Sequence, residues 1–257
     1  MHRFRRAIAR LPAENFAEGL TTVSFGVPDF TLVLLQHVAY VEALRKAGVD
    51  VMVLDSNPAY PDSTFVEDTA IVANGRAIVT RPGASSRTGE TGAIAQTLRL
   101  FFDELDTIEA PGTLDGGDVC EADGRVYVGI SHRTNASGAE QLAAWLGRSG
   151  IETTAVDIRD VDEILHLKSG IAYIGDDTFV AIEAVRSRVD LPGRVIVPVA
   201  EENYAANCVR VNDAVFFPSG YPRLQGALHD AGFHLAILNM SEYRKMDGGL
   251  SCLSIRF

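Results

Sequence analysis

Short apolar runs joined by tight turns recur along the chain, and each pair is followed by a helical pattern and a further strand. The clearest example has apolar runs at 66–73 and 77–80 separated by Asn74-Gly75, a strong signal for a β-hairpin. Apolar residues then continue at helical spacing from Ile94 to Leu105, which predicts an amphipathic helix. The pattern therefore predicts a unit of two paired strands, a helix and a third strand.

Four other stretches follow the same order. The third unit has strands at 118–122, 126–130 and 151–156, and Ser137 with Glu140 predicts a capping box at the start of its helix. The fourth has strands at 171–174, 179–182 and 194–199 around a weakly marked helix. The fifth has strands near 207–208 and at 214–217 and 234–238, with a helix at 222–231. The first has a helix at 33–47 between strands at 4–10 and 50–54, so it lacks one strand.

The units begin at nearly equal intervals. Asp68, Asp118, His166, Cys208 and Cys252 are separated by 50, 48, 42 and 44 positions, and periods of this length are typical of radial or solenoid arrays. The C-terminal strand can supply the strand that the first unit lacks, which would leave no exposed sheet edge there. We therefore predict a closed ring of five units whose starting segments meet at the central axis.

The last eleven residues present a single cysteine after two glycines. Gly248 and Gly249 allow a sharp turn before Cys252, and the alternation of apolar and polar residues from Leu253 to Phe257 predicts a half-buried strand. This arrangement suits a nucleophile. This stretch taken alone favours a buried structural thiol, because free cysteine is among the most buried residue types.

Other candidate residues occur at the starts of the units. Glu67 and Asp68 enter an apolar strand, where carboxylates are costly without partners. His166 lies between two leucines and is either a functional group or a core histidine. Asp115 and Asp118 flank two glycines and could belong to a turn. In a closed ring, these side chains would share one central pocket with Cys252.

Composition and charge narrow the class of protein. A chain of 257 residues with 47% hydrophobic and 22% charged residues fits a globular protein of one or two domains. The net charge of −11 argues against a nucleic-acid partner and permits a cationic substrate. No apolar run approaches the ~20 residues of a membrane span. The basic segment Met1 to Arg6 is followed by Arg10 and Pro12, so we predict no export signal.

Cysteine usage bears on the compartment. Cys120, Cys208 and Cys252 are an odd number and widely spaced, which is neither a disulfide framework nor a metal-binding pair. We interpret Cys120 and Cys208 as ordinary buried thiols. A reducing compartment is the simplest interpretation, and we expect a cytoplasmic location.

Seven motifs occur in colinear order along the chain. They are Phe65-Val66-Glu67-Asp68, Arg81-Pro82-Gly83-Ala84, Leu114-Asp115-Gly116-Gly117-Asp118-Val119, Arg133-Thr134-Asn135, Leu165-His166-Leu167-Lys168-Ser169, Ala206-Asn207-Cys208 and Asp247-Gly248-Gly249-Leu250-Ser251-Cys252. These motifs resemble those of the dimethylarginine dimethylaminohydrolase family, whose members are guanidine-modifying enzymes with the pentein fold, an α/β-propeller with five ββαβ blades and pseudo-fivefold symmetry. The resemblance runs from about Arg6 to the C-terminus and implies a single catalytic domain over residues 1–257.

The resemblance also implies a role for individual residues. It makes Cys252 the nucleophile and His166 the general acid and base. It places Asp68, with Glu67 and Asp115 nearby, on the substrate guanidinium and on the histidine. The remaining implied contacts are Asp62 and the Leu20 carbonyl with the α-amino group, Arg87 and Arg133 with the α-carboxylate, and the Met246 carbonyl with a guanidinium nitrogen. Arg87 lies in a loop with little sequence marking, so a solvated surface charge is an equal alternative.

The expected chemistry suits these residue types. A guanidinium carbon is a poor electrophile, so its hydrolysis needs a strong nucleophile and an acid that protonates the leaving amine. Cys252 as thiolate and His166 as imidazolium would form a thiouronium intermediate, which activated water then hydrolyses. Dimethylarginine would give citrulline and dimethylamine, and monomethylarginine would give methylamine. We expect no metal and no organic cofactor.

The acidic surroundings of the cysteine lead to a further hypothesis. Carboxylates near Cys252 should keep its thiol neutral in the empty enzyme. A bound cation about 4 Å away contributes on the order of 4 kcal/mol at an effective dielectric constant of 20, or roughly 3 pKa units. We therefore expect the substrate to promote ionisation of its own nucleophile.

Two alternatives remain at this point. One is a deiminase that acts on arginine or a related guanidine and releases ammonia, because a few methyl groups contribute only about 1–3 kcal/mol each to discrimination. The other is a non-catalytic binding protein, like the ribosome-associated initiation factors of the same fold, which the negative charge and the set of Cys252, His166 and Asp68 disfavour. We expect a small methylated arginine as partner, with neither nucleic acid nor membrane, and leave a homodimer open.

Overall fold

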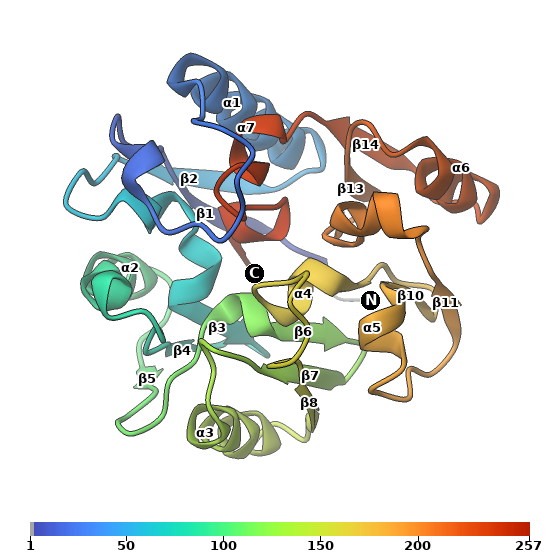
Figure 1. Cartoon of the computed structure of the whole chain (residues 1–257). Helices are drawn as coiled ribbons and strands as arrows, with labels where there is room; N and C mark the ends of the chain where they lie inside the picture. Colours follow the sequence, from blue (N-terminus) through green and yellow to red (C-terminus); the bar gives the residue numbers. More distant parts are fainter. Residues whose placement is uncertain (1–2) are drawn as a thin grey trace.

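Five three-stranded sheets form a ring in the computed structural model of the protein, which describes residues 3–257 (Figure 1). Each sheet contains an antiparallel pair and a third strand that is parallel to the central strand. Met1 and His2, the start of the basic N-terminal segment, lie outside the described residues. This arrangement confirms the predicted five-bladed α/β-propeller.

The blades follow the chain in order, and each contains one helix between its last two strands (Figure 1). Blade 1 contains β15 (Ile255–Arg256), β1 (Arg6–Arg10), α1 (Phe30–Lys46) and β2 (Asp50–Leu54). Blade 2 contains β3 (Ala70–Ala73), β4 (Arg76–Val79), α2 (Thr91–Leu98) and β5 (Leu105–Thr107). Blade 3 contains β6 (Val119–Ala122), β7 (Arg125–Ile130), α3 (Ala136–Gly147) and β8 (Glu152–Asp157). Blade 4 contains β9 (Ile171–Tyr173), β10 (Thr178–Ala181), α5 (Glu183–Arg186) and β11 (Arg194–Ile196). Blade 5 contains β12 (Val209–Val211), β13 (Ala214–Pro218), α6 (Pro222–Asp230) and β14 (Leu235–Leu238).

Short helices occupy the segments that lead into the inner strands. The two short α-helices are α4 (Leu167–Gly170) and α7 (Ser241–Arg244). The 3-10 helices are η1 (Phe16–Glu18), η2 (Pro61–Thr64), η3 (Val66–Thr69), η4 (Ser85–Glu90), η5 (Gly116–Asp118), η6 (Ala200–Ala206) and η7 (Ser251–Leu253). Several of these segments lie near the middle of the ring in Figure 1.

The two ends of the chain close the ring. β15 pairs antiparallel with β1 through Ala7 with Arg256 and Ile8 with Ile255, and β1 pairs in parallel with β2. The C-terminus consequently lies near the centre of Figure 1. This pairing confirms that the last strand completes the first unit, and it leaves no unpaired edge between the ends of the chain.

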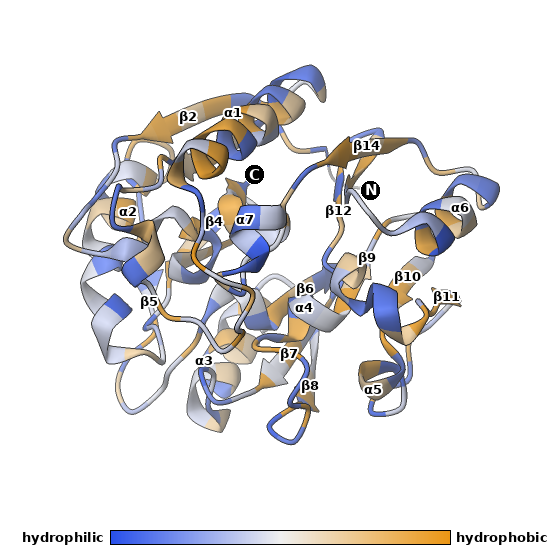
Figure 2. Cartoon of the chain, turned by 45° about the horizontal axis from the view of Figure 1, so that its top comes forward, coloured by the Kyte–Doolittle hydropathy of each residue, from blue (hydrophilic) through white to orange (hydrophobic). Residues whose placement is uncertain are grey.

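The strands are largely hydrophobic, and the helices contain both hydrophobic and hydrophilic residues (Figure 2). In blade 3, Leu142, Trp145 and Leu146 are at most 2% exposed, so this side of α3 packs on the core. Within residues 3–257, none of the helices combines the length and the hydrophobicity needed to cross a bilayer.

Two predicted helix boundaries are wrong. α2 ends at Leu98, and Leu105 belongs to strand β5, because Phe101 and Phe102 leave the helical path and pack against Phe257 with ring centroids 5.2 and 5.3 Å away. Helix α3 is capped by Asn135, whose side chain accepts the Gly138 N–H at 2.8 Å. The predicted capping box of Ser137 and Glu140 therefore does not start this helix.

Two predicted strands are shorter than expected. Residues 66–69 form η3, so the first strand of blade 2 begins only at Ala70. Cys252 lies in η7 and the final strand is Ile255–Arg256. Ser254 is fully buried and its Oγ lies 2.6 Å from the Tyr40 hydroxyl. The predicted alternation of buried apolar and exposed polar residues fails at this serine because the hydroxyl pair satisfies its polar atom.

Candidate active site

A small pocket lies where the starting segments of the blades meet. Its volume is about 20 Å³, room for roughly one water molecule, so an amino acid enters only if lining groups shift. Eight of the ten predicted site residues line it, whereas Glu67 and Asp115 do not. The lining residues are Leu20, Asp62, Phe65, Asp68, Arg87, Arg133, Leu165, His166, Met246, Asp247, Gly248 and Cys252.

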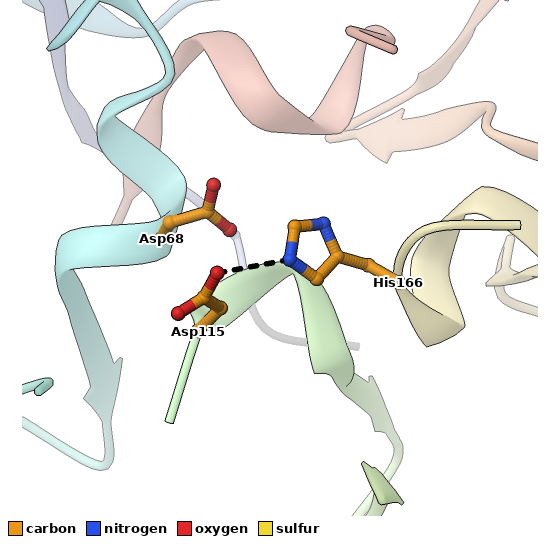
Figure 3. Close-up of side chains that lie close together, drawn as sticks. All are labelled: Asp68, Asp115 and His166. Carbon is orange, nitrogen blue, oxygen red and sulfur yellow. Dashed lines mark hydrogen bonds and ion pairs between the residues drawn. The ribbon is translucent and has the colours of Figure 1, made fainter. Parts of the chain in front are cut away.

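His166 and two aspartates form the most compact polar group near the pocket (Figure 3). His166 Nε2 lies 3.0 Å from Asp115 Oδ2, and Asp68 Oδ1 accepts the Gly117 N–H at 2.8 Å. One ligand atom from each of Asp68, Asp115 and His166 lies within 4.8 Å of the others. A Cβ atom on Gly117 would be 2.8 Å from His166 Nδ1, so glycine is needed there to let the ring approach.

Three folded segments deliver these side chains. Asp68 belongs to η3, Asp115 directly precedes η5, and His166 directly precedes α4. The second oxygen of Asp115 accepts the Gly83 N–H at 2.8 Å, which holds the carboxylate toward the imidazole. The geometry therefore fixes the orientation of the ring through its Nε2 atom.

The same trio is the group of described residues with metal-ligand geometry. Asp68 is also ion-paired with Arg87, and a guanidinium beside a ligand carboxylate opposes the binding of a metal cation. These residues consequently suit an organic cation with N–H donors better than a metal ion.

The charges of the group stabilise a protonated histidine. Burial opposes the charge on His166, but Asp68, Asp118 and the hydrogen bond with Asp115 together raise the pKa of the imidazole to about 9. Burial likewise opposes the charge on Asp68, but His166 and Arg87 lower the pKa of its carboxyl. At neutral pH the pocket thus holds an imidazolium that can donate a proton.

Cys252 lies in η7, and its thiol is neutral in the empty pocket. Burial, followed by the charges of Glu67 and Asp68, raises the pKa of the thiol to about 12, while a hydrogen bond with the Gly249 backbone opposes this increase. Gly249 lies against Asn207, where an added Cβ would be 2.5 Å from Asn207 Cγ. The glycine therefore allows the backbone close approach that brings the cysteine to the pocket.

Arg87 is a buried member of the pocket rather than a surface residue. It is 4% exposed, and its guanidinium binds Asp68 through Nη1 at 2.5 Å and Glu90 through Nη2 at 2.8 Å. The surface-charge alternative for Arg87 is wrong. Its guanidinium orients Asp68, and its contact with the substrate α-carboxylate stays a prediction.

Glu90 is a site residue that the sequence reasoning missed. Both of its oxygens accept the Arg87 Nε–H, at 3.0 and 3.2 Å. Burial raises the pKa of the Glu90 carboxyl to about 7, although Arg87 acts in the opposite direction. The sequence did carry one signal for this ion pair, because Arg87 and Glu90 are three residues apart.

Glu67 lies behind the pocket. Its Oε1 atom binds Lys168 Nζ at 2.6 Å and Arg256 Nη2 at 3.0 Å. The structure therefore gives Glu67 two protein cations as partners, and its predicted place near the substrate guanidinium stays a prediction. Lys168 and Arg256 were not among the predicted site residues, although Lys168 follows His166 in the same motif.

Polar groups at the outer end of the pocket remain available to a ligand. The Asp62 carboxylate accepts the Leu20 N–H at 3.0 and 3.2 Å, and burial raises the pKa of its carboxyl. The guanidinium of Arg133 and the carbonyl of Met246 have no hydrogen-bond partner within residues 3–257. This end of the pocket thus offers one cation, one carboxylate and one carbonyl.

Comparisons with known proteins agree with this geometry. The family model for eukaryotic N,N-dimethylarginine dimethylhydrolases matches residues 31–209. The N(G),N(G)-dimethylarginine dimethylaminohydrolase of Pseudomonas aeruginosa is 41% identical over 99% of this chain and 100% of its own length. The chain belongs to the dimethylarginine dimethylaminohydrolase family. Members of this family act on amidino groups, so family membership identifies the protein as a hydrolase of that kind.

Solved structures of the dimethylarginine dimethylaminohydrolase family superpose closely on the chain. An adduct with S-methyl-L-thiocitrulline has a TM-score of 0.94 at 41% identity and covers 99% of this chain and 100% of its own. A Pseudomonas aeruginosa mutant complexed with citrulline has a TM-score of 0.92 at 39% identity, with full coverage of both chains. These relatives bind small arginine-like molecules on the same five-bladed scaffold.

Proposed function

We propose that this protein hydrolyses Nω,Nω-dimethyl-L-arginine to L-citrulline and dimethylamine, and Nω-monomethyl-L-arginine to L-citrulline and methylamine. The observation that carries the proposal is the pocket in which Cys252 and the protonated His166 lie beside Asp68. The full-length similarity to the Pseudomonas aeruginosa enzyme supports the choice of a methylated arginine as substrate.

The reaction begins with the substrate cation between Asp68 and the cysteine. The bound cation promotes loss of the Cys252 thiol proton to solvent. The resulting thiolate attacks the guanidinium carbon, and the C–N bond to the methylated nitrogen breaks as the His166 imidazolium transfers its proton to that nitrogen. Dimethylamine leaves and a thiouronium remains on Cys252. Asp115 holds the imidazole of His166 in the orientation that this transfer requires.

Hydrolysis of the intermediate reverses the proton path. The neutral imidazole of His166 removes a proton from a water molecule, and the resulting hydroxide attacks the thiouronium carbon. The C–S bond then breaks with release of the Cys252 thiolate, and the hydroxyl proton passes to solvent as the carbonyl of the ureido group of citrulline forms. The imidazolium formed in this step is ready for the next cycle.

The outer polar groups fix the amino-acid end of the substrate. Arg133 binds the α-carboxylate, while Asp62 and the carbonyl of Leu20 bind the α-amino group. The Met246 carbonyl accepts a hydrogen bond from the guanidinium. Arg87 acts through Asp68, because its guanidinium is held by Asp68 and Glu90. Glu67 acts from behind the pocket through its charge on Cys252.

The cellular setting is proposed from the same residues. We propose one catalytic domain over residues 1–257 that acts without metal or organic cofactor and has no nucleic-acid or membrane partner. All three cysteines are unpaired, which supports a cytoplasmic location. A homodimer stays a prediction to be tested by the mass of the protein in solution.

The released amine distinguishes the proposed reaction from its alternatives. Purified protein is incubated separately with dimethylarginine, monomethylarginine and arginine, and the amine and citrulline are identified. Dimethylamine in equal amount to citrulline supports the proposal. Ammonia from arginine as the main product would indicate a deiminase, and no product from any substrate would indicate a binding protein. The Cys252→Ser variant should lose turnover while it still binds dimethylarginine.

A further inference from the structure

A second and larger cavity lies at the other end of the blades. Its volume is about 430 Å³, and all five blades contribute to its lining, including the hairpin turns at Asn74-Gly75 and Asp123-Gly124. The catalytic pocket is formed by segments that precede the inner strands, such as η3, whereas these turns follow them. The two cavities therefore open toward opposite faces of the ring. We name this second space the rear cavity.

The inner end of the rear cavity contains charged groups with unused hydrogen-bonding capacity. Lys168 lines it, and Glu67 is the one carboxylate ion-paired with its ammonium among residues 3–257, which leaves two of three N–H donors for a ligand. Arg256 is 10% exposed and its buried Nε has no acceptor in the same residues. The side chain of Glu121 lines the cavity from β6 and has no hydrogen-bond or ion-pair partner in the described chain.

The charges around this end are balanced. Lys168 and Arg256 are positive, while Glu67 and Glu121 are negative. Glu67 binds both cations, so Glu121 is the carboxylate left for a ligand. A ligand with only an anion or only a cation would disturb this balance, whereas a zwitterion satisfies Lys168 and Glu121 together.

Apolar residues form part of the walls of the rear cavity. Val72, Ile171 and Phe257 line it on three different blades, and a volume of about 430 Å³ is within the range of small-molecule sites. We propose that the rear cavity binds an apolar L-α-amino acid, with its carboxylate on Lys168, its ammonium on Glu121 and its side chain between the apolar walls. This proposal concerns binding and does not depend on the proposed hydrolase reaction.

The rear cavity is adjacent to the candidate nucleophile. Ser251 lines the rear cavity and Cys252 lines the catalytic pocket. Glu67 binds Lys168 and also raises the pKa of the Cys252 thiol. A ligand carboxylate on Lys168 would therefore alter the charge felt by the thiol from behind.

Three probes that share one apolar body test the proposal. Binding of L-phenylalanine, 3-phenylpropanoate and 2-phenylethylamine to the full-length protein is measured by titration calorimetry. We expect L-phenylalanine to bind at least tenfold more tightly than either probe that lacks one charged group, because each charged contact is lost in turn. Equal affinities for all three probes, or no binding of L-phenylalanine up to 10 mM, would overturn the proposal.

Variants locate the bound amino acid. Glu121→Gln should weaken L-phenylalanine binding at least tenfold and leave 3-phenylpropanoate unchanged, whereas Glu140→Gln, at an exposed position on α3 outside the cavity, serves as the matched control. Arg133→Ala alters the catalytic pocket and should have no effect. If Arg133→Ala abolishes L-phenylalanine binding while Glu121→Gln does not, the amino acid binds in the catalytic pocket and the rear-cavity assignment is wrong. If a variant fails to fold, the comparison of the three probes on the unmodified protein still tests the proposal.

Discussion

The guanidinium of Arg87 lies 2.5 Å from the carboxylate of Asp68, and both side chains are 5% exposed. A second carboxylate, Glu90, binds the same guanidinium at 2.8 Å. Arg87→Ala would leave two buried carboxylates unpaired, so we expect a loss of about 3–5 kcal/mol in the free energy of unfolding and a large decrease in kcat. Urea unfolding and steady-state kinetics with dimethylarginine measure both effects.

Arg133, a second arginine in the pocket, allows the structural role of Arg87 to be separated from substrate binding. Arg133→Ala removes a guanidinium that has no hydrogen-bond partner in the described residues, so we expect KM to rise with little change in unfolding. Arg87→Lys should recover stability only in part, because an ammonium lacks the planar fork that binds two carboxylates. An Arg87→Ala variant of normal stability with only a raised KM would show that Arg87 binds substrate directly.

Asp115 controls the protonation and orientation of His166. Asp115→Asn removes a carboxylate 3.0 Å from the imidazole, so we expect the pKa of His166 to fall below its value of about 9. The stabilisation from charged His166 is complete below pH 6.5 and is lost as pH rises through 9. In the variant this loss should occur at lower pH, and kcat should fall roughly 10²–10⁴-fold.

Titration of the His166 ring protons by NMR measures the shift directly. Asp123→Asn, at a distant hairpin turn, is the control and should leave both the titration and kcat unchanged. An Asp115→Asn variant whose imidazole still titrates near pH 9 would assign the raised pKa to Asp68 and Asp118 instead.

The ring architecture was predictable because its information is distributed along the whole chain. Intervals of 42 to 50 positions between unit starts indicated five modules, and the missing strand in the first module indicated closure by the C-terminus. The lengths of individual helices and strands were less predictable. Leu105 continued a helical pattern, yet Phe101 and Phe102 pack on Phe257, a residue more than 150 positions away that no local pattern reveals.

In the candidate site, the reacting groups were predictable from the sequence and their supporting contacts were not. Cys252, His166 and Asp68 are recognisable from residue type and position, because cysteine, histidine and buried carboxylates are costly or reactive in apolar surroundings. The burial of Arg87 is a property of the packed loop 85–90, which has no apolar period. The partners of Glu67 also depend on packing, because Lys168 and Arg256 reach it from other blades. Sequence motifs therefore identified the reacting groups better than their supporting ion pairs.

Asn207 holds the turn that carries the cysteine. Its Oδ1 accepts the Ser251 N–H at 3.1 Å and its Nδ2 donates to Ser251 Oγ at 3.2 Å. Asn207→Ala should loosen the turn and weaken the contact between the Gly249 backbone and the thiol, so we expect a higher pKa for Cys252 and a kcat lower by about 10–10²-fold. The rate of alkylation by iodoacetamide against pH measures the thiol.

A second buried asparagine controls for lost stability. Asn212 donates to the carbonyls of Phe4 and Ala47 at 3.0 and 2.8 Å, away from the pocket. Asn212→Ala should reduce the free energy of unfolding without changing the alkylation profile. If both variants alter alkylation equally, the effect of Asn207 is general destabilisation.

His37 makes the folded protein sensitive to acid. Burial lowers the pKa of its imidazole from 6.5 to about 4, although a hydrogen bond with the Arg10 backbone acts in the opposite direction. The unfolded chain therefore binds a proton that the folded chain excludes between these values, so stability is present above pH 6.5 and is lost as pH falls through 4. The shift corresponds to about 3 kcal/mol.

Urea unfolding at pH 7 and pH 4 tests this contribution. His37→Leu should lose less stability between the two pH values than the unmodified protein does. His229→Leu, on an 82% exposed side chain, should behave like the unmodified protein. Identical acid sensitivity in the unmodified protein and His37→Leu would assign the effect to the buried carboxylates.

The ionisation of Cys252 should depend on a bound cation. Burial, Glu67 and Asp68 raise the pKa of the thiol to about 12 in the empty pocket, so at pH 7 the nucleophile is almost entirely protonated. A guanidinium about 4 Å from the sulfur contributes on the order of 4 kcal/mol, or roughly 3 pKa units.

The absorbance of the thiolate near 240 nm, with that of Cys252→Ser subtracted, gives a titration curve of the thiol. This curve should therefore shift to lower pH when a non-hydrolysed guanidinium ligand is added. An uncharged ureido ligand such as L-citrulline occupies the same pocket and should produce a much smaller shift. Equal shifts with both ligands would mean that exclusion of water or movement of the protein, rather than the positive charge, controls the thiol.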